Sequence, residues 1–232
     1  MPTPMTTLFV LGLLVAGASP AFGQSASAAY PAMAPIAQYQ SATREAEIAL
    51  ARSAAPPSIS NEAEILVLGA RGYETALSGK NGFVCIVERG WANDFDHAEF
   101  WSPKVRSPFC YNAAAARSVL PTYLKRTEWV LSGAPKAEMV KRTRAALAAK
   151  TIRPPETGSM CYMMSKDGYL NDDGGHWRPH LMYFLPRTEP ALWGANLPGS
   201  PMMGTAGGLE PLTIFFAPVP NWSDGSPGPM TM

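Results

Sequence analysis

Residues 79–88 read Gly-Lys-Asn-Gly-Phe-Val-Cys-Ile-Val-Glu, a turn followed by an apolar run. Asn-Gly between apolar runs is a strong hairpin signal, because both residues tolerate positive φ. Two more short apolar runs, 64–69 and 73–77, precede this turn and are separated by Arg71-Gly72. The pattern predicts a three-strand meander, with 83–88 as its buried third strand.

Helix signals and further strand signals lie on either side of this meander. Pro56-Pro57 ends a run of helical spacing, and Asn112 and Pro135 stand where two later helices would begin. Residues 180–185 are apolar on both alternating faces, which predicts a central strand. We therefore expect one α+β domain over 38–232, with a largely antiparallel sheet and three or four helices. The expected helices are 38–53, 113–120 continuing after Pro121 as 123–131, and 135–150, and the later strands are 160–165, 180–185 and 212–219.

The amino terminus has the pattern of an export signal. Residues 8–18 read LFVLGLLVAGA, and Ala21-Phe22-Gly23 forms a small-residue cleavage site before Gln24. We interpret 1–23 as a signal peptide and 24–37, which is rich in Ala, Ser and Pro, as a mobile lead-in. No later apolar segment approaches the roughly 20 residues that cross a bilayer. The mature protein is expected to be soluble and periplasmic or extracellular.

Three cysteines in an exported chain are read first as disulfide candidates. We favour Cys85 with Cys110, because Cys110 follows the Pro-rich loop that leaves the 83–88 strand. Closing a loop of about 26 residues would stabilise the fold by roughly 3 kcal/mol. Cys161 is then a thiol, interpreted as a small apolar residue in a strand, with a reactive thiol or soft-metal ligand as the alternative.

The same residues carry a family resemblance. The run 79–85, followed by Pro108-Phe109-Cys110, resembles an Asn-Gly-Phe-x-Cys…Cys signature of exported bacterial proteins of unassigned function. The resemblance implies export and the association of these two cysteines. It implies no activity.

Composition and missing motifs exclude several classes of protein. The net charge of +1 over 232 residues argues against a dedicated nucleic-acid binder, which needs a clear basic excess. The sequence holds no Gly-x-Ser-x-Gly, Ser-x-x-Lys, phosphate loop, Gly-x-Gly-x-x-Gly, Cys-x-x-Cys or His-Glu-x-x-His. The sequence therefore contains no motif that would indicate a standard serine hydrolase, a nucleotide enzyme, a thioredoxin or a zincin. It implies no cofactor.

Two loops collect side chains that ligate metals or transfer protons. Loop 91–101 holds His97 and Glu99, and loop 171–180 holds Asp172, Asp173 and His176. These residues are candidates for a metal or acid-base site. Ordinary turn acids and hydrogen-bonded histidines are the alternative, which the absence of ligand spacing favours. Neither loop matches an EF-hand calcium loop.

A basic run lies between Lys125 and Arg153, where eight Lys and Arg stand against two Glu. Within it, Lys141, Arg142 and Arg144 are candidates for contact with an anionic envelope polymer or lipid headgroups. The alternative is the solvated face of amphipathic helices. A copper(I) site with Cys161 is an alternative interpretation of five methionines, for which core filling is favoured: Met160, Met163, Met164, Met202 and Met203.

Together these features predict a non-catalytic binding or structural module of the periplasm or cell envelope, whose partner the sequence does not name. The alternative is a metal-assisted hydrolase that uses loops 91–101 and 171–180. This alternative requires His97, His176 and a carboxylate within coordination distance of one another.

Overall fold

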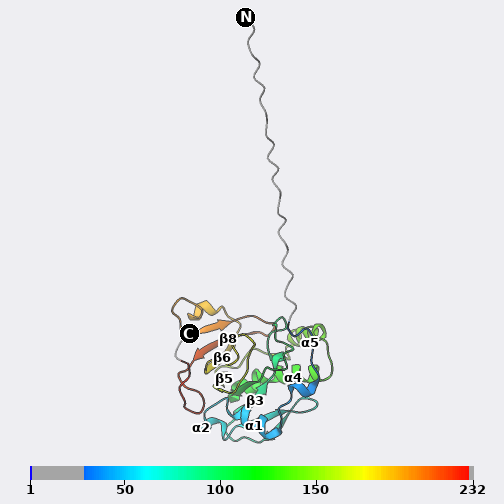
Figure 1. The fold of residues 1–232 in the computed structure, drawn as a ribbon, viewed down its shortest axis with the longest axis vertical. Coiled ribbons are helices and arrows are strands. Elements are labelled where there is room, and N and C mark those ends of the chain that lie inside the picture. The colour runs from blue at the N-terminus through cyan, green and yellow to red at the C-terminus, as the bar shows by residue number, and fades with distance from the viewer. Residues whose placement is uncertain (2–28, 230–232) are drawn as a thin grey trace.

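One eight-stranded sheet carries the fold, in the order β2-β1-β3-β4-β5-β6-β8-β7 (Figure 1). The computed structural model describes Met1 and residues 29–229. Only β1 and β3 pair in parallel, so the chain forms a single α+β domain with a mostly antiparallel sheet, as predicted. The strands are β1 Glu64–Leu68, β2 Tyr73–Leu77, β3 Val84–Glu88, β4 Ser107–Tyr111, β5 Met160–Met163, β6 His180–Pro186, β7 Met203–Thr205 and β8 Leu212–Pro218. The helices are α1 Arg44–Arg52, α2 Pro57–Ser60, α3 Ala113–Ser118, α4 Leu120–Leu131 and α5 Lys136–Ala148, with 3-10 turns η1 Ile36–Tyr39, η2 Gly90–Ala92 and η3 Pro190–Trp193.

Capping residues set the helix boundaries. Asn112 caps α3 by accepting a hydrogen bond from the Ala115 N–H (2.9 Å), and Pro121 lies in the first turn of α4, as expected. The prediction of one helix over 38–53 is wrong in its first half. Thr43 is extended and accepts from the Ala46 N–H (3.1 Å), so α1 begins only at Arg44 and 36–39 form the separate turn η1.

The predicted meander is also wrong, because β3 lies beside β1 rather than beside β2. The Lys80 N–H donates to the Glu62 carbonyl (2.7 Å), and the Glu64 N–H donates to the Phe83 carbonyl (2.8 Å). The Asn-Gly segment therefore crosses the start of β1 instead of closing a hairpin. A Cβ at Gly79 would lie 2.1 Å from the Glu64 nitrogen, so this crossing requires glycine.

Strand β4 was not predicted, although it lies between β3 and β5 and is buried throughout. Pro108 marks this stretch as loop in sequence, because proline has no N–H for a central ladder. The β4–β5 ladder contains only the pairs of Cys110 and Tyr111, so Pro108 lies outside it. The three-residue β7 was missed because it is too short to show a pattern.

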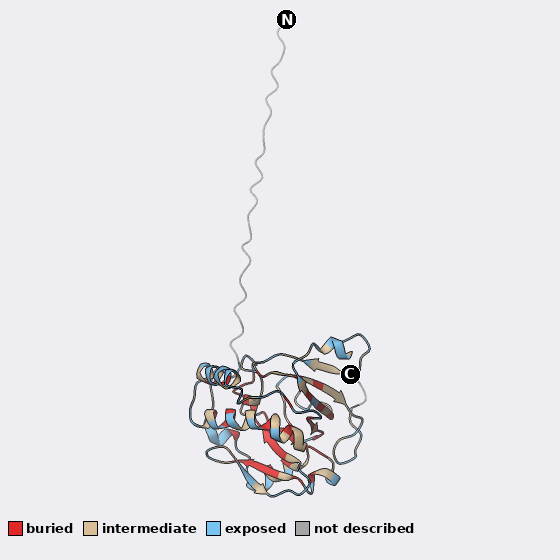
Figure 2. Cartoon of the chain, turned by 180° about the vertical axis from the view of Figure 1, so that it is seen from behind, coloured by how far each residue is buried: buried red, intermediate tan, exposed pale blue. Residues whose placement is uncertain are grey.

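Alternate residues of the central strands face two apolar clusters, one on each side of the sheet. Ala51 of α1 and the turn after it cover one face, and Ala115, Val119 and Leu120 of the α3–α4 region cover the other. In Figure 2 the strands of this part of the sheet are mostly red, whereas the strands near the carboxyl end are tan. The core is therefore concentrated around β1, β3 and β4.

The cysteines follow the expected pattern. Cys85 and Cys110 lie opposite each other in the β3–β4 ladder and form a disulfide. Cys161 is a buried thiol in β5, and burial raises its pKa well above the ordinary value. Raising the pKa removes the thiolate that a nucleophile or soft-metal ligand needs.

The predicted signal peptide and the first part of the lead-in lie outside the described residues, apart from Met1. From Tyr30 onward the lead-in contacts the domain: the Tyr30 hydroxyl donates to the Asp172 carboxylate (2.5 Å), and Met33 packs on a cluster around Trp91. Within the described residues, no helix combines the length and the apolar character that a bilayer span requires.

Candidate functional site

The two loops rich in acids and histidines meet at one point. There the Glu99 carboxylate accepts a hydrogen bond from the Asp172 N–H (2.6 Å). Hydrogen bonds from Tyr169, Tyr30 and Lys104 engage the Asp172 carboxylate and lower its pKa to about 2. These hydrogen bonds join the lead-in to both loops. They also occupy both oxygens of the Asp172 carboxylate.

The histidines of these loops do not join that contact. His97 and His176 are both exposed, and the His97 Nδ1 accepts from the Glu99 N–H of its own turn (3.2 Å). Asp173 lies in the exposed turn before His176. Across residues 29–229, no three side chains of His, Cys, Asp or Glu gather closely enough to hold a metal ion. The geometry that the hydrolase alternative requires is not formed there.

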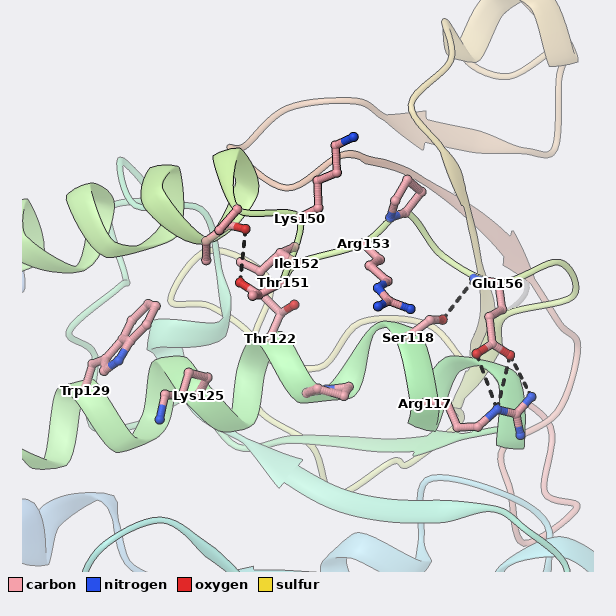
Figure 3. Close-up of a pocket in the computed structure, with 14 residues that line it drawn as sticks. Arg117, Ser118, Thr122, Lys125, Trp129, Lys150, Thr151, Ile152, Arg153 and Glu156 are labelled. Atoms are coloured by element: carbon pink, nitrogen blue, oxygen red, sulfur yellow. Dashed lines mark hydrogen bonds and ion pairs between the residues drawn. The ribbon is translucent and has the colours of Figure 1, made fainter.

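A groove of about 830 Å³ lies between α4 and the chain that follows α5 (Figure 3). Volumes of this size are typical of ligand sites. Its lining includes two arginines, two lysines and one tryptophan. The lining residues are Arg117, Ser118, Pro121, Thr122, Lys125, Trp129, Ala146, Ala149, Lys150, Thr151, Ile152, Arg153, Pro154 and Glu156.

Local helix geometry places these side chains. Thr122, Lys125 and Trp129 recur every three to four residues and therefore share one side of α4. On the opposite wall, Lys150 adopts the left-handed conformation (φ 56°) and ends the helical turn. Its N–H donates to the Leu147 carbonyl (3.0 Å), and the Thr151 N–H donates to Ala146 (2.9 Å), so backbone groups satisfy these carbonyls. The cationic side chains are not used for capping.

The charges of the groove do not cancel. Among the described residues, Glu156 is the one acid that lines it, and Arg117 engages that carboxylate through Nη2 (2.7 Å) and Nε (3.2 Å). Lys125 pairs with Glu128 (2.6 Å). In the described part of the chain Lys150 and Arg153 form no ion pair, and Figure 3 shows Arg153 extending from its wall toward Ser118. The groove therefore has a net positive charge.

Two buried acid-base groups with shifted pKa values lie outside the groove. Burial raises the pKa of Glu88 to about 7, and the Tyr111 hydroxyl donates to its carboxylate (2.6 Å). Burial lowers the pKa of His180 to about 4; its Nδ1 donates to the Arg178 carbonyl (2.6 Å), and its buried Nε2 has no hydrogen-bond partner among residues 29–229. Neither residue lines the groove, and no His, Cys or Asp of the described residues does so.

His180 instead borders a smaller pocket of about 220 Å³ with Trp177, Arg178, Met203 and Pro218. The Trp177 ring meets the His180 ring edge-on, with 4.7 Å between their centroids. The buried Nε2 carries less than 1 Å² of accessible surface, so a ligand in this pocket would not touch it. The pocket is mainly apolar and offers a ligand little that is specific.

The groove overlaps the basic region that the sequence indicated, but the three cations singled out there lie outside it. Lys141, Arg142 and Arg144 are exposed on α5 and do not line it. Arg142 pairs with Glu138 (3.0 Å) and lies 5.9 Å from the Trp129 ring. Lys125, Lys150 and Arg153 belong to the basic run, so the charge pattern could have identified them. Arg117 and Trp129 are brought to the groove by tertiary structure and carried no signal.

No protein family, curated protein or solved structure shows detectable similarity to this chain. No activity is therefore transferred from a relative. The function has to be inferred from the groove, from the disulfide and from the surface of the domain.

Proposed function

We propose that the chain is an exported, non-catalytic binding module that holds an anionic envelope polymer in the groove between α4 and residues 149–156. One observation carries this proposal: Lys150 and Arg153 line a large groove beside Arg117 and Lys125, and only one carboxylate lines it with them. Clefts lined by one sign of charge concentrate ligands of the opposite sign. The ligand is accordingly polycarboxylated or polyphosphorylated.

The shape of the groove favours a chain-like ligand. Figure 3 places Trp129 at one end and the Arg117–Glu156 pair at the other, with Arg153 between them on the opposite wall. A polymer that follows this line would meet several cations in succession. The partly buried indole of Trp129 adds an apolar platform, which suits a sugar ring better than a bare phosphate chain.

A binding role fits the groove better than a hydrolytic one. Glycoside hydrolysis ordinarily requires two carboxyl groups that flank the scissile bond. The groove provides Glu156 alone, and its carboxylate is engaged by Arg117. No histidine or cysteine lines the walls to act as base or nucleophile.

Export is supported by the disulfide and by the signal-like amino terminus. Disulfides such as Cys85–Cys110 persist mainly in oxidising compartments. The apolar run 8–18 and the small-residue site at 21–23 have the order expected of a signal peptide. Both features agree with a partner that belongs to the cell envelope.

The test is calorimetric titration of the mature protein with polygalacturonate, with polyphosphate and with neutral dextran. Each titration is made at two salt concentrations. We expect binding to both polyanions, weakened by salt, and none to dextran. Lys150→Gln with Arg153→Gln should weaken binding at least about ten-fold. Trp129→Ala should weaken binding of polygalacturonate more than binding of polyphosphate, which distinguishes the two ligand chemistries.

The matched control removes two exposed cations away from the groove, Arg71 and Lys80, by substitution with glutamine. It changes the net charge by the same amount as the groove variant. Equal losses in the two double variants would show that the polymer responds only to overall charge. That result, or equal binding of dextran, would overturn the proposal.

A further inference from the structure

A short lobe near the carboxyl end exposes large apolar side chains. Leu192 is 81% exposed, Trp193 55% and Leu197 49%. From 190 to 209 the sequence has no charged residue and no histidine. Single exposed apolar residues are ordinary, but three within six positions on an uncharged lobe mark an interaction surface.

The lobe is held in a defined shape. The Asn196 side chain donates to the Gly204 carbonyl (2.7 Å) and accepts from the Gly204 N–H (3.0 Å), which joins the lobe to β7. Ala195 is fully buried, and the Trp193 ring packs against Phe215 of β8 at 5.7 Å. These contacts fix the backbone while Leu192 points outward. The exposure is therefore a property of the fold and not of a loose segment.

The position of the lobe adds a second observation. In the two opposite views of Figures 1 and 2, η3 and α5 lie at the same end of the molecule, at its two corners. Lys141 and Arg144 are exposed on the side of α5 opposite its buried residues Met139 and Thr143, and within the described residues neither forms an ion pair. A flat surface placed against this end would meet apolar side chains at one corner and cations at the other.

We propose that this end of the molecule docks on an anionic lipid bilayer. Leu192, Trp193 and Leu197 insert between the headgroups, and Lys141 and Arg144 of α5 contact anionic headgroups. The indole suits this depth because its ring is apolar and its N–H is polar. Juxtamembrane Lys and Arg are attracted to anionic leaflets over about a Debye length.

A bilayer fits the lobe better than a protein partner does. Protein interfaces combine apolar anchors with a polar rim and about one hydrogen bond per 100–200 Å². Between 190 and 209 no charged side chain is available for such a rim, and the one asparagine in the lobe is engaged by Gly204. The lobe also lies at an outer corner of the fold (Figure 2). The proposal does not rest on polymer binding in the groove.

The test is flotation of the mature protein with vesicles of phosphatidylcholine alone, or of phosphatidylcholine with 30% phosphatidylglycerol, in about 0.05 and 0.5 M salt. We expect flotation with the anionic vesicles. Leu192→Ser with Trp193→Ser should reduce it at least ten-fold at both salt concentrations. Lys141→Gln with Arg144→Gln should reduce it about ten-fold or more in low salt, on anionic vesicles only.

Two controls make the outcome decisive. Ile36→Ser removes an exposed apolar residue from η1 and should float like the wild type. Lys150→Gln with Arg153→Gln should also float normally, so failure of the groove proposal is separate from failure of this one. Absence of flotation, or normal flotation of the Leu192/Trp193 variant, would overturn the proposal. Dimers in light scattering that the same variant abolishes, without lipid binding, would identify a second copy of the chain as the partner instead.

Discussion

Two three-strand regions of the sheet, an enclosed half and an open half, are built differently, with β5 between them and β2 at the edge beyond β1. In the half formed by β1, β3 and β4 nearly every residue is buried, because α1 covers one face and the α3–α4 region covers the other. In the half formed by β6, β8 and β7 burial alternates along β6 and β8, and the three residues of β7 are only partly buried or exposed. Tyr183 of β6 stays 38% exposed on the face that η3 partly covers. One half is enclosed by helices and the other remains partly open.

This difference decides where each half places its polar groups. The enclosed half buries charge: Glu47 of α1 pairs with Arg89, which follows β3, at 2.8 Å. Glu47 also accepts from the Leu68 N–H, and the Arg89 Nε donates to the Tyr39 carbonyl (2.7 Å). The open half instead exposes apolar side chains around η3. A second buried pair, Arg126 with Glu210, joins α4 to the chain just before β8 and so links the halves.

The largest expected effect comes from breaking the buried pair of the enclosed half. Arg89→Leu leaves the Glu47 carboxylate buried with only one hydrogen bond. Removing one partner of a buried ion pair costs about 3–5 kcal/mol. Urea denaturation should show this loss in the free energy of unfolding.

The exposed pair of Arg44 with Glu74 is the matched control. Arg44→Leu should cost less than about 1 kcal/mol, because both side chains are solvated. Adding Glu47→Gln to Arg89→Leu should recover part of the loss, since the uncompensated charge disappears. A loss below that of the Arg44 control would show that the enclosed half tolerates buried charge.

The same difference explains what could be predicted from the sequence. The apolar runs of β1 and β3 are local signals, and the Cys85–Cys110 pair was identified from its place in the chain. The pairing of β1 with β3 was not predicted, because Asn-Gly is a hairpin signal in the sequence. Only the structure shows that Gly79 packs against the backbone of Glu64. Contacts across the chain, such as Arg117 with Glu156, leave no periodic trace in the sequence. The sequence therefore predicted a basic region but not the groove that the fold forms there.

A second prediction concerns the pH response of the enclosed half. Burial holds the pKa of Glu88 at about 7, above its ordinary 4.5. Between pH 4.5 and 7 the Glu88 carboxyl is therefore protonated in the folded state and ionised in the unfolded chain. Because the folded state binds more protons, the free energy of unfolding falls as pH rises through this range. The loss is on the order of 3 kcal/mol.

Glu88→Gln should remove this loss while keeping an oxygen that accepts from Tyr111. Urea denaturation of both proteins between pH 5 and 8 measures the difference. Parallel stability curves for the wild type and the variant would contradict the assignment, because Glu88 would then be ionised in both states. The Tyr111→Phe variant removes the donor and should move the Glu88 transition to higher pH.

The open half should respond to pH in the opposite direction. Burial lowers the pKa of His180 to about 4, so the folded state keeps a neutral imidazole while the unfolded chain binds a proton below 6.5. The free energy of unfolding then falls as pH drops from 6.5 to 4, by about 2–3 kcal/mol.

His180→Gln should flatten this acid limb, and the exposed His176→Gln is the control that should not. Thermal melts from pH 4 to 7 measure both. Carboxylates elsewhere also titrate in this range, so the relevant quantity is the difference between each variant and the wild type. An acid limb that His180→Gln leaves unchanged would place the titrating groups outside β6.

The smallest expected effect is on the apolar lobe. Leu192→Ala should change the free energy of unfolding by no more than about 0.5 kcal/mol, because a side chain that is 81% exposed gains little from folding. Leu66→Ala, in the enclosed half, removes a similar side chain from the core and should cost about 2–5 kcal/mol. Urea denaturation of the two variants compares one residue type in both halves. If Leu192→Ala costs more than about 1 kcal/mol, the side chain packs on the domain and is not available to a bilayer. If the cost is small, its apolar surface contributes little to folding and stays available for the proposed contact with a bilayer.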